Sequence, residues 1–288
     1  MDQPDAVTAP GEARAVDRRA ERAAAKRAQD VRGGLIATIS TVVVLGGLVA
    51  LILTSDGWPS VKEKFFDWDI FKETFPDIFH AFWLDIRVFM SVEVAVLILG
   101  LLVALARVSS GPALFPLRVL AFSYTTIFRG IPTILLVYLV GFGVPALNLT
   151  FPDWMVEPVI LGGFALALSY GAYVAEVYRA GLLSVHPGQR EAALAAGLTE
   201  RQAMRHVVIP QAIRNVGPPL LNDFIALQKD VALIAIIGVT GEAFRQAQIA
   251  TLDNFNYTPL LGAALLYLAV TLPLALWLDR WEKRRLAR

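Results

Sequence analysis

Ionisable side chains inside long apolar stretches are the residues of this chain that could do chemistry. Such groups are costly in a membrane-length stretch, so they usually face a protein interior, a water-filled path or a partner. Glu93 lies about ten residues into its stretch, roughly 15 Å deep at the rise of a helix. Arg129 precedes Gly130 and Pro132, a helix break whose freed backbone groups need partners. Such a break often borders a translocation path. A buried arginine that joins two helices is an equal alternative.

Two polar stripes lie along the stretch at residues 213–239. Asn222 and Lys229 are seven residues apart and share one helical face, as do Asp223 and Asp230. A helix with two polar stripes is surrounded by protein or water rather than by lipid. Whether these groups touch a solute or hold helices together stays open. Together with two residues of an earlier stretch, they make up our set of candidate path-lining residues: Glu93, Arg129, Ser169, Tyr170, Asn222, Asp223, Lys229 and Asp230.

Other polar residues of these stretches favour structural roles. Glu176 and Arg179 are three residues apart with the acid first, so we expect a structural ion pair on one helix. Small residues beside this pair, at Gly171, Ala172 and Ala175, would let a second helix approach closely. Asp85 and Arg87 lie at the beginning of the stretch at residues 83–106, close to the outer boundary of the membrane, which we expect both side chains to reach.

The stretch from Gly188 to Pro210 is polar, and apolar segments flank it. Residues 191–196 are strong helix formers, and Gly197 suits the left-handed residue that closes a helix. Thr199 and Gln202 have the spacing of a capping box, so a second helix is expected to begin at once and to end near Pro210. The pattern predicts two short helices joined by a glycine corner. We interpret such a solvated hairpin as a docking surface.

The composition places these elements in a membrane. Hydrophobic residues make up 56% of the 288 residues and charged residues only 18%, which is typical of a polytopic membrane protein. We therefore predict an all-α chain with six spans. They are centred on residues 35–53, 83–106, 113–144, 159–183, 213–239 and 260–278.

The segments outside the spans complete the predicted organisation. Residues 1–32 form a basic cytoplasmic tail, and residues 33–54 form the first span, which is too long for a signal-peptide core. Residues 55–82 carry charges and aromatic rings, as interfacial segments outside the membrane do. Residues 83–285 form the main transmembrane domain.

The distribution of basic residues orients the chain. Eighteen lysines and arginines lie in the two tails, the loop at 107–118 and the hairpin, against four on the opposite side. The positive-inside rule therefore predicts a multi-pass protein of the plasma (inner) membrane with both termini and the hairpin in the cytoplasm.

Several function classes are excluded or disfavoured by the sequence. It contains no G-x-x-x-x-G-K-[ST] motif, so the chain has no P-loop of its own. No nucleophile-elbow context appears, and a net charge of +1 does not suggest nucleic acid. With no cysteine and three scattered histidines, we expect no metal site and no catalytic residue. Nothing recommends an enzyme.

The hairpin carries a family resemblance. Glu191-Ala192-Ala193, then Gly197, then V-x-I-P ending at Pro210 resembles the EAA signature of permease subunits of bacterial ATP-binding-cassette (ABC) importers. The stretches FRGIPTILL (128–136), GAYVAEVYRAGLLSVHPGQREAALAAGL (171–198) and VIPQAIRNVGPPLLNDFIALQKD (208–230) resemble the polar amino-acid permeases of the histidine, glutamine and glutamate group. The resemblance covers roughly residues 83–285.

The resemblance implies a type I importer core of five helices, preceded here by one extra span. It implies that the hairpin is a cytoplasmic coupling helix that docks on a dimeric ATPase, with Glu191, Ala192, Ala193, Gly197 and Pro210 as the coupling motif. A second permease subunit, homologous or identical, would complete the pore, and an extracytoplasmic binding protein would deliver the substrate. This chain would hold no cofactor, because ATP and magnesium are bound by the ATPase. The substrate would be a polar amino acid, glutamate- or glutamine-like, moved inward by alternating access.

Departures from the family pattern bear on which substrate the resemblance implies, and not on the implied ATP-driven transport mechanism. Val231-Ala232-Leu233 follows the Lys229-Asp230 pair where the family commonly has Thr/Ser-Ser-Leu, and Ser169-Tyr170-Gly171 replaces Asn-Ser-Gly. The first span and the basic tail resemble those of actinobacterial glutamate-uptake permeases. Alternatives are an importer for another zwitterion such as a betaine, or a secondary carrier in which Glu93 or Asp230 carries protons. A membrane-anchored scaffold would leave the polar stripes unexplained.

Overall fold

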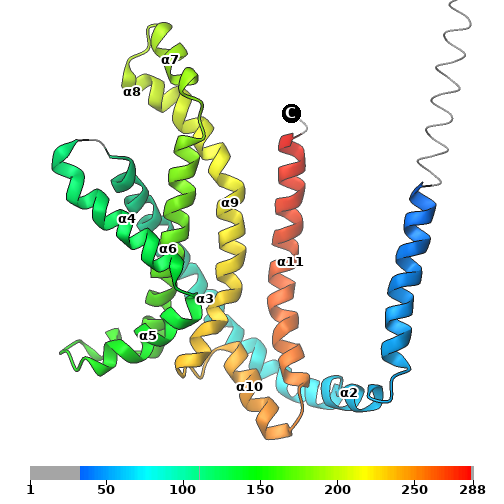
Figure 1. The fold of residues 1–288 in the computed structure, drawn as a ribbon. Coiled ribbons are helices and arrows are strands. Elements are labelled where there is room, and N and C mark those ends of the chain that lie inside the picture. The colour runs from blue at the N-terminus through cyan, green and yellow to red at the C-terminus, as the bar shows by residue number, and fades with distance from the viewer. Residues whose placement is uncertain (1–32, 110, 287–288) are drawn as a thin grey trace, which may run out of the picture. The chain divides into compact units, whose positions relative to one another are not determined.

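The computed structural model describes residues 33–109 and 111–286, and all regular elements of that part of the chain are helical (Figure 1). The chain divides into two compact units, Met1–Glu63 and Lys64–Arg288. The first contains the apolar helix Gly33–Leu53, which is long enough to span a membrane and is wholly exposed within the described residues. The predicted basic tail at residues 1–32 lies outside the described part.

A long helix begins the main unit. Helix α3, Trp68–Val108, follows the short helix α2, Trp58–Phe65, and the side chain of Asp67 caps it by accepting from the backbone N–H groups of Asp69 and Ile70. The sequence suggested a separate interfacial segment before a span starting near residue 83. In the structure α3 instead begins at Trp68 and runs without a break, so the aromatic segment and the span belong to one helix.

The third predicted span is broken where the sequence placed the break. Helix α4, Phe115–Gly130, and helix α5, Thr133–Ala146, meet at an angle of 106°. Pro132 restricts the residue before it to extended backbone, and Ile131 has φ −95° and ψ 127°. The two halves therefore turn sharply and do not form one straight span.

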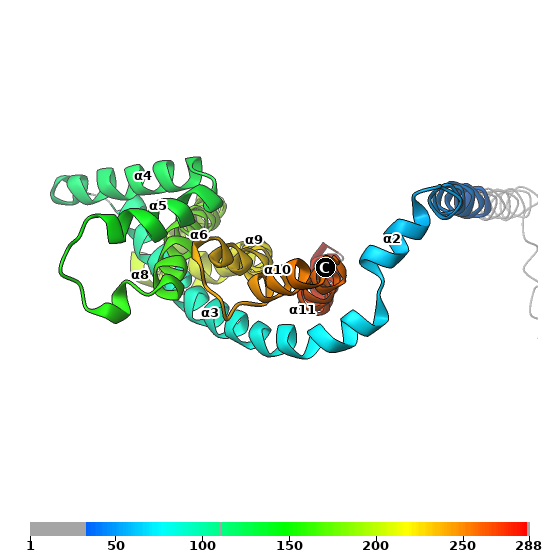
Figure 2. The ribbon, with the colours of Figure 1, turned by 90° about the horizontal axis from the view of Figure 1, so that it is seen from below.

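Helix α6, Pro158–Leu183, packs against α3, α4, α5 and α9 (Figures 1 and 2). The elements that follow α6 are α7 Pro187–Ala195, α8 Glu200–Ala203, the π-helix η3 Met204–Val208, α9 Ile209–Asp230, the 3₁₀ helix η4 Val231–Ile237, α10 Ala243–Asn254 and α11 Thr258–Leu286. Two one-turn 3₁₀ helices, η1 Pro112–Leu114 and η2 Asp153–Met155, lie in the earlier loops.

Four helices in the described residues are long and apolar enough to cross a membrane, or five if the bent pair counts as one span. Helix α9 is not among them, because its polar stripes lower its hydropathy. The six-span arrangement thus stays a prediction, and it depends on α9 crossing the membrane inside a protein environment.

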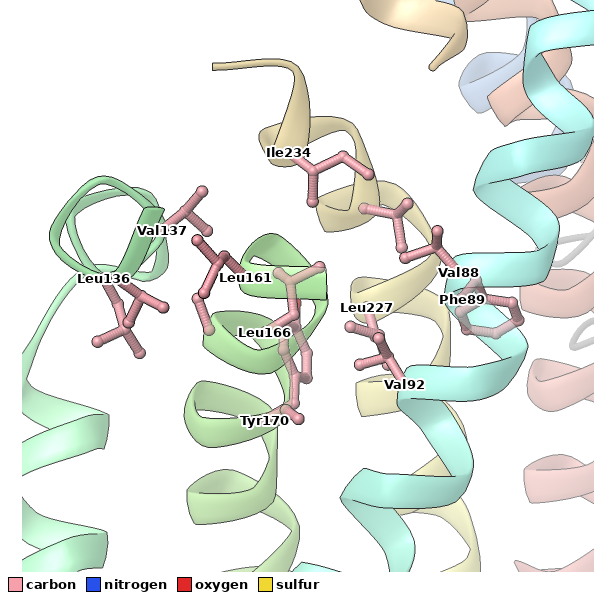
Figure 3. Close-up of a cluster of buried hydrophobic side chains, with 14 of the residues drawn as sticks. Val88, Phe89, Val92, Leu136, Val137, Leu161, Leu166, Tyr170, Leu227 and Ile234 are labelled. Atoms are coloured by element: carbon pink, nitrogen blue, oxygen red, sulfur yellow. The ribbon is translucent and has the colours of Figure 1, made fainter. Parts of the chain in front are cut away.

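The main core lies where α3, α5, α6, α9 and η4 meet (Figure 3). Figure 3 shows Leu166 of α6 beside Leu227 of α9 and Val92 of α3, and all three side chains are buried. The continuous burial of α6 explains why it is apolar along most of its length. Helix α6 therefore provides the scaffold that holds the polar side chains of its C-terminal half.

Small residues bring helices close to α6. A Cβ at Gly171 would lie 2.8 Å from Leu99 Cδ2 of α3, and one at Gly100 would lie 2.6 Å from Val174 Cγ1. Ala172 and Ala175 are fully buried. The close approach predicted from the small residues at 171–175 is confirmed, and α3 is the helix that approaches.

Candidate functional site: an exposed hairpin and a polar helix junction

The hairpin predicted at residues 188–210 begins with helix α7 and closes at Gly197. Gly197 has φ +91°, and its N–H donates to Leu194 O at 2.9 Å. The N–H of Leu198 donates to Ala193 O at 3.2 Å. These two bonds make a complete Schellman motif, which satisfies carbonyl groups that the end of a helix leaves free. The glycine corner read from the sequence is confirmed.

The second arm starts with the predicted capping box. Gln202 N–H donates to Thr199 Oγ1 at 3.3 Å, and Thr199 N–H donates to Gln202 Oε1 at 2.9 Å. An ion pair between Arg190 of α7 and Glu200 of α8, at 2.5 Å, joins the two arms. The hairpin is therefore held by its own local bonds, which explains why its shape is legible in the sequence.

Pro210 does not end the second arm, and the expectation that it would do so is wrong. The chain stays helical from α8 through the π-helix η3 into α9, and Pro210 occupies the first turn of α9. Its missing N–H leaves a carbonyl of the preceding turn without its helical partner. A π segment just before the proline accommodates that missing bond by shifting the hydrogen-bond register.

Within the proposed coupling motif the side chains differ in exposure. Glu191, Ala192 and Gly197 are exposed, whereas Ala193 is buried at 7% exposure. The exposed acid and the buried alanine lie on opposite faces of α7. One face of α7 thus packs on η3 while the face with Glu191 is available for contact.

Polar side chains from α5, α6 and α9 meet at the helix break. Ser169 Oγ of α6 lies 2.9 Å from Thr133 Oγ1 at the start of α5. Tyr170 donates from its hydroxyl to Asp230 Oδ2 of α9 at 2.8 Å. Tyr170 also lies at the lower end of the core cluster in Figure 3, so its ring is packed while its hydroxyl bonds a carboxylate. Three of the predicted path residues are thus placed at one junction.

Arg129 lies at the end of α4 and is held against α6. Its guanidinium stacks over the ring of Tyr173 at 5.6 Å, and the Tyr173 hydroxyl donates to Arg129 O at 3.3 Å. Arg129 Nη1 lies 3.9 Å from Glu176 Oε2. The side chain is 43% exposed, so it is only partly committed to these contacts.

Glu176 receives more basic partners than the sequence indicated. Arg179 donates to its Oε1 through Nε at 2.9 Å, as expected for the i, i+3 pair, and Arg107 of α3 donates to its Oε2. The carboxylate is about one-fifth exposed, and the Arg107 side chain is even less exposed. The pair predicted within one helix is therefore part of a group that also ties α3 and α4 to α6.

The two stripes of α9 have different surroundings. Asn222 and Lys229 are exposed, whereas Asp223 and Asp230 are half-buried toward α6. Asp223 is near enough to Glu93 of α3 and to Arg129 for their charges to interact. Glu93 itself is buried at 8% exposure.

This junction combines carboxylates, a guanidinium and hydroxyl groups between four helices. Asp223 keeps one buried oxygen, Oδ2, without a hydrogen-bond partner in the described residues. Groups of both signs, held apart by helix packing, can bind a zwitterion at its two ends. The structure brings Glu93, Arg129, Asp223 and Asp230 to this junction and leaves Asn222 and Lys229 on an exposed face.

Comparison with known families identifies the fold to which this geometry belongs. The family described as the binding-protein-dependent transport system inner membrane component matches residues 96–286. This match covers the hairpin and most of the polar junction. The chain belongs to this family. Its helices are those of a type I ABC permease, and its relatives are transport components rather than catalysts.

Individual relatives of this permease are amino-acid transport proteins. The probable amino-acid permease protein YxeN of Bacillus subtilis (strain 168) is 35% identical over 75% of this chain and 95% of its own length. The glutamine transport system permease protein GlnP of Escherichia coli (strain K12) is 35% identical over 65% of this chain and 83% of its own length. A solved structure described as an amino acid ABC transporter with histidines superposes with a TM-score of 0.67 at 32% identity, covering 76% of this chain and 98% of its own.

Some structural residues of the permease escaped the sequence analysis. Asp85 does not reach the outer boundary, as had been expected, but is buried at 2% exposure against α10 and α11. Buried Gln228 of α9 accepts from Thr271 Oγ1 of α11 at 2.7 Å. The partners of both residues are more than 40 positions away in the chain, so no local pattern could have revealed them.

Proposed function

We propose that this chain is the permease half of an ATP-driven importer that moves a polar amino acid into the cytoplasm. The observation that carries the proposal is the hairpin, a self-capped pair of helices with an exposed acid, found in a chain of the binding-protein-dependent permease family. A surface of this kind transmits work when it contacts the open and closed states of a partner differently.

The proposed assembly has three kinds of partner. A cytoplasmic ATPase dimer binds ATP and magnesium and contacts the coupling motif. A second permease subunit completes the pore, and an extracytoplasmic binding protein delivers the substrate. Both termini and the hairpin lie on the cytoplasmic side of the inner membrane, as the basic residues indicate.

The polar junction is the proposed inner part of the substrate path. An amino acid carries a carboxylate and an ammonium group, and Arg129 can bind the first while Asp223 or Glu93 binds the second. The relatives are named for several amino acids, so glutamate or glutamine remains a proposal based on the resemblance. Neither a betaine importer nor an ion-driven carrier is favoured by these relatives.

Charge reversal on the hairpin tests the coupling role. We expect Glu191→Lys to abolish uptake and weaken ATPase co-purification while the protein still inserts, because Glu191 is exposed. Gly197→Asp should do the same by disrupting the Schellman corner, where φ is positive. Glu73→Lys, the same reversal on an exposed residue of α3, is the matched control and should transport normally.

Normal uptake in both hairpin variants would contradict the coupling role.

Energy source and substrate are tested separately on the unmodified chain. Uptake should survive a proton uncoupler while cellular ATP is maintained, and immediate collapse would indicate a secondary carrier. In competition assays, unlabelled polar amino acids should block uptake and glycine betaine should not.

A further inference from the structure

A buried group of two carboxyls and one hydroxyl joins α3, α10 and α11. Asp85 of α3 is 2% exposed and Glu242, which precedes α10, is fully buried. Tyr267 of α11 lies between them. The three helices pack together in both views of the fold (Figures 1 and 2). None of these residues belongs to the proposed coupling motif or to the candidate path-lining set, so their burial needs another explanation.

The contacts of Tyr267 require one hydrogen more than the group would have if Asp85 and Glu242 were both ionised. Its hydroxyl oxygen lies 2.8 Å from Asp85 Oδ2 and 2.8 Å from Glu242 Oε1. A hydroxyl has one hydrogen, and it can complete only one of two contacts this short. The second contact needs a hydrogen from a carboxyl group. Two ionised carboxyls sharing one site without solvent would also repel each other strongly.

The remaining bonds decide which carboxyl holds the proton. Glu242 accepts from the backbone N–H of Phe244 at 2.8 Å and of Arg245 at 2.7 Å, which stabilises its ionised form. Burial raises the pKa of Glu242, and these bonds oppose that rise. Asp85 accepts only one backbone N–H, from Ala243 at 3.4 Å, and its Oδ1 has no partner in the described residues.

We propose that Asp85 is a neutral carboxylic acid that donates to Tyr267, which in turn donates to ionised Glu242. The proton lies on Asp85 Oδ2, the tyrosine hydrogen points to Glu242 Oε1, and every short contact then has its own hydrogen. Asp85 and Tyr267 are positioning residues. They fix the N-cap of α10 between two long helices.

The surroundings of this group keep the proton in place. Apolar residues of α3 and α10 pack around it, and the ring of Phe82 meets the Tyr267 ring edge-on at 5.2 Å. The first turn of α10 also carries Arg245, whose Nη1 donates to Gln248 Oε1 at 3.4 Å. Losing the proton would leave a second negative charge with little solvent to stabilise it.

The group of Asp85, Glu242 and Tyr267 is also connected along the chain to the polar junction. Helix α10 follows η4, which directly continues the α9 segment ending in Lys229 and Asp230. Anchoring the first turn of α10 thus limits how far η4 can move. This role is independent of the proposed substrate and of the proposed ATPase contact.

Amide substitutions distinguish the two carboxyls. Asp85→Asn keeps a donor toward Tyr267 in place of the acid hydrogen, so we expect thermal stability and uptake near those of the unmodified chain. Glu242→Gln replaces an acceptor that receives three hydrogen bonds, and the ratio of folded to unfolded protein should fall by about tenfold. Equal losses in both variants, or the reverse order, would overturn the assignment of the proton to Asp85.

Infrared spectroscopy tests the proton directly and needs no transport. With the full chain in nanodiscs at neutral pH, the spectrum of the unmodified protein minus that of Asp85→Asn should contain the carbonyl band of a protonated carboxylic acid. Asp279→Asn, an exposed acid, is the control and should yield carboxylate bands only. Carboxylate bands alone in the Asp85 difference spectrum would overturn the proposal.

The pH dependence of stability gives a second check. At neutral pH the folded chain holds a proton that an unfolded aspartate, with its ordinary pKa of about 3.9, has already released, so the stability of the unmodified protein should fall as pH rises. The unfolding equilibrium should change by about tenfold per pH unit relative to Asp85→Asn in that range. Parallel pH profiles for the two proteins would contradict a bound proton. The infrared and stability measurements test the bound proton whether or not the chain is an importer.

Discussion

At the residue scale, Glu176 is the centre of a cluster of arginines that shares Arg129 with the polar junction. It accepts from Arg107 of α3 and Arg179 of its own helix, and Arg129 of α4 lies 3.9 Å away. Arg179 reaches Glu176 because the acid precedes it by three residues on the same helix, a spacing that is visible in the sequence. The contacts from α3 and α4 depend on the packing of separate helices.

Removing this charge is expected to destabilise the fold. Glu176→Gln leaves three guanidinium groups without their shared carboxylate, and the loss of charge-assisted bonds should cost about 2 kcal/mol of unfolding free energy. Thermal unfolding in nanodiscs would measure it. The exposed pair Asp279–Lys283 provides the control, since Lys283→Met should change stability by less than about 1 kcal/mol. Equal effects of the two variants would contradict the central role of Glu176.

At the element scale, the close packing of α6 against its neighbours depends on small residues, and the shape of the hairpin depends on helix caps. A Cβ at Gly181 of α6 would lie 1.9 Å from Val216 Cγ1 of α9, closer than atoms can approach. The polar junction lies between these same two helices. Their close spacing at this point therefore depends on Gly181, which is neither in the proposed coupling motif nor in the candidate path-lining set.

The spacing can be tested by a substitution and its compensation. Gly181→Ala should push α9 from α6 and cost about 1–3 kcal/mol, as overpacking does. Val216→Ala in the same chain removes the clashing methyl group, so the double variant should recover most of the lost thermal stability. If the second change gives no recovery, the contact does not set the helix spacing.

The positive φ of Gly197 at the hairpin corner predicts that any residue with a Cβ will strain the backbone there. Gly197→Ala forces a residue with a Cβ to φ +91°, at a cost of about 1–2 kcal/mol, although nothing lies within 4 Å of the new atom. Gly143→Ala is the matched control in α5, where the added Cβ also meets nothing and helix propensity favours alanine by about 1 kcal/mol. Hydrogen exchange of the hairpin amides should rise in the first variant only. Unchanged exchange in both would contradict the strain argument.

At the scale of the whole molecule, the two units differ in how much of their apolar surface is buried within the chain. The helix Gly33–Leu53 buries none of its residues within the described chain, whereas α6 buries well over half of its apolar window. The family match also begins inside α3, at residue 96. The main unit therefore holds the core, the junction and the hairpin without the first helix.

A truncated chain should test this independence. We expect a protein that starts at Trp58, behind a new initiator methionine, to insert, bind the ATPase and keep its thermal stability. Membrane fractionation, co-purification and uptake would measure these properties. Degradation of the truncated chain would show that the first helix stabilises the main unit.

The sequence by itself determined the features that depend on neighbouring residues. The glycine corner, the capping box and the break at Ile131–Pro132 are local, because each is fixed by backbone restrictions and bonds within a few residues. The family could be named from the same local motifs. Six spans, the path-lining roles and the membrane orientation stay predictions.

Only the tertiary structure decided which distant polar groups meet. Asp85 was expected at the membrane boundary and is instead buried with Tyr267, 182 residues away in the chain. Arg107 reaches Glu176 over 69 residues. Such pairs form when packed helices bring their faces together, and no pattern within one helix specifies which partner the other helix will present.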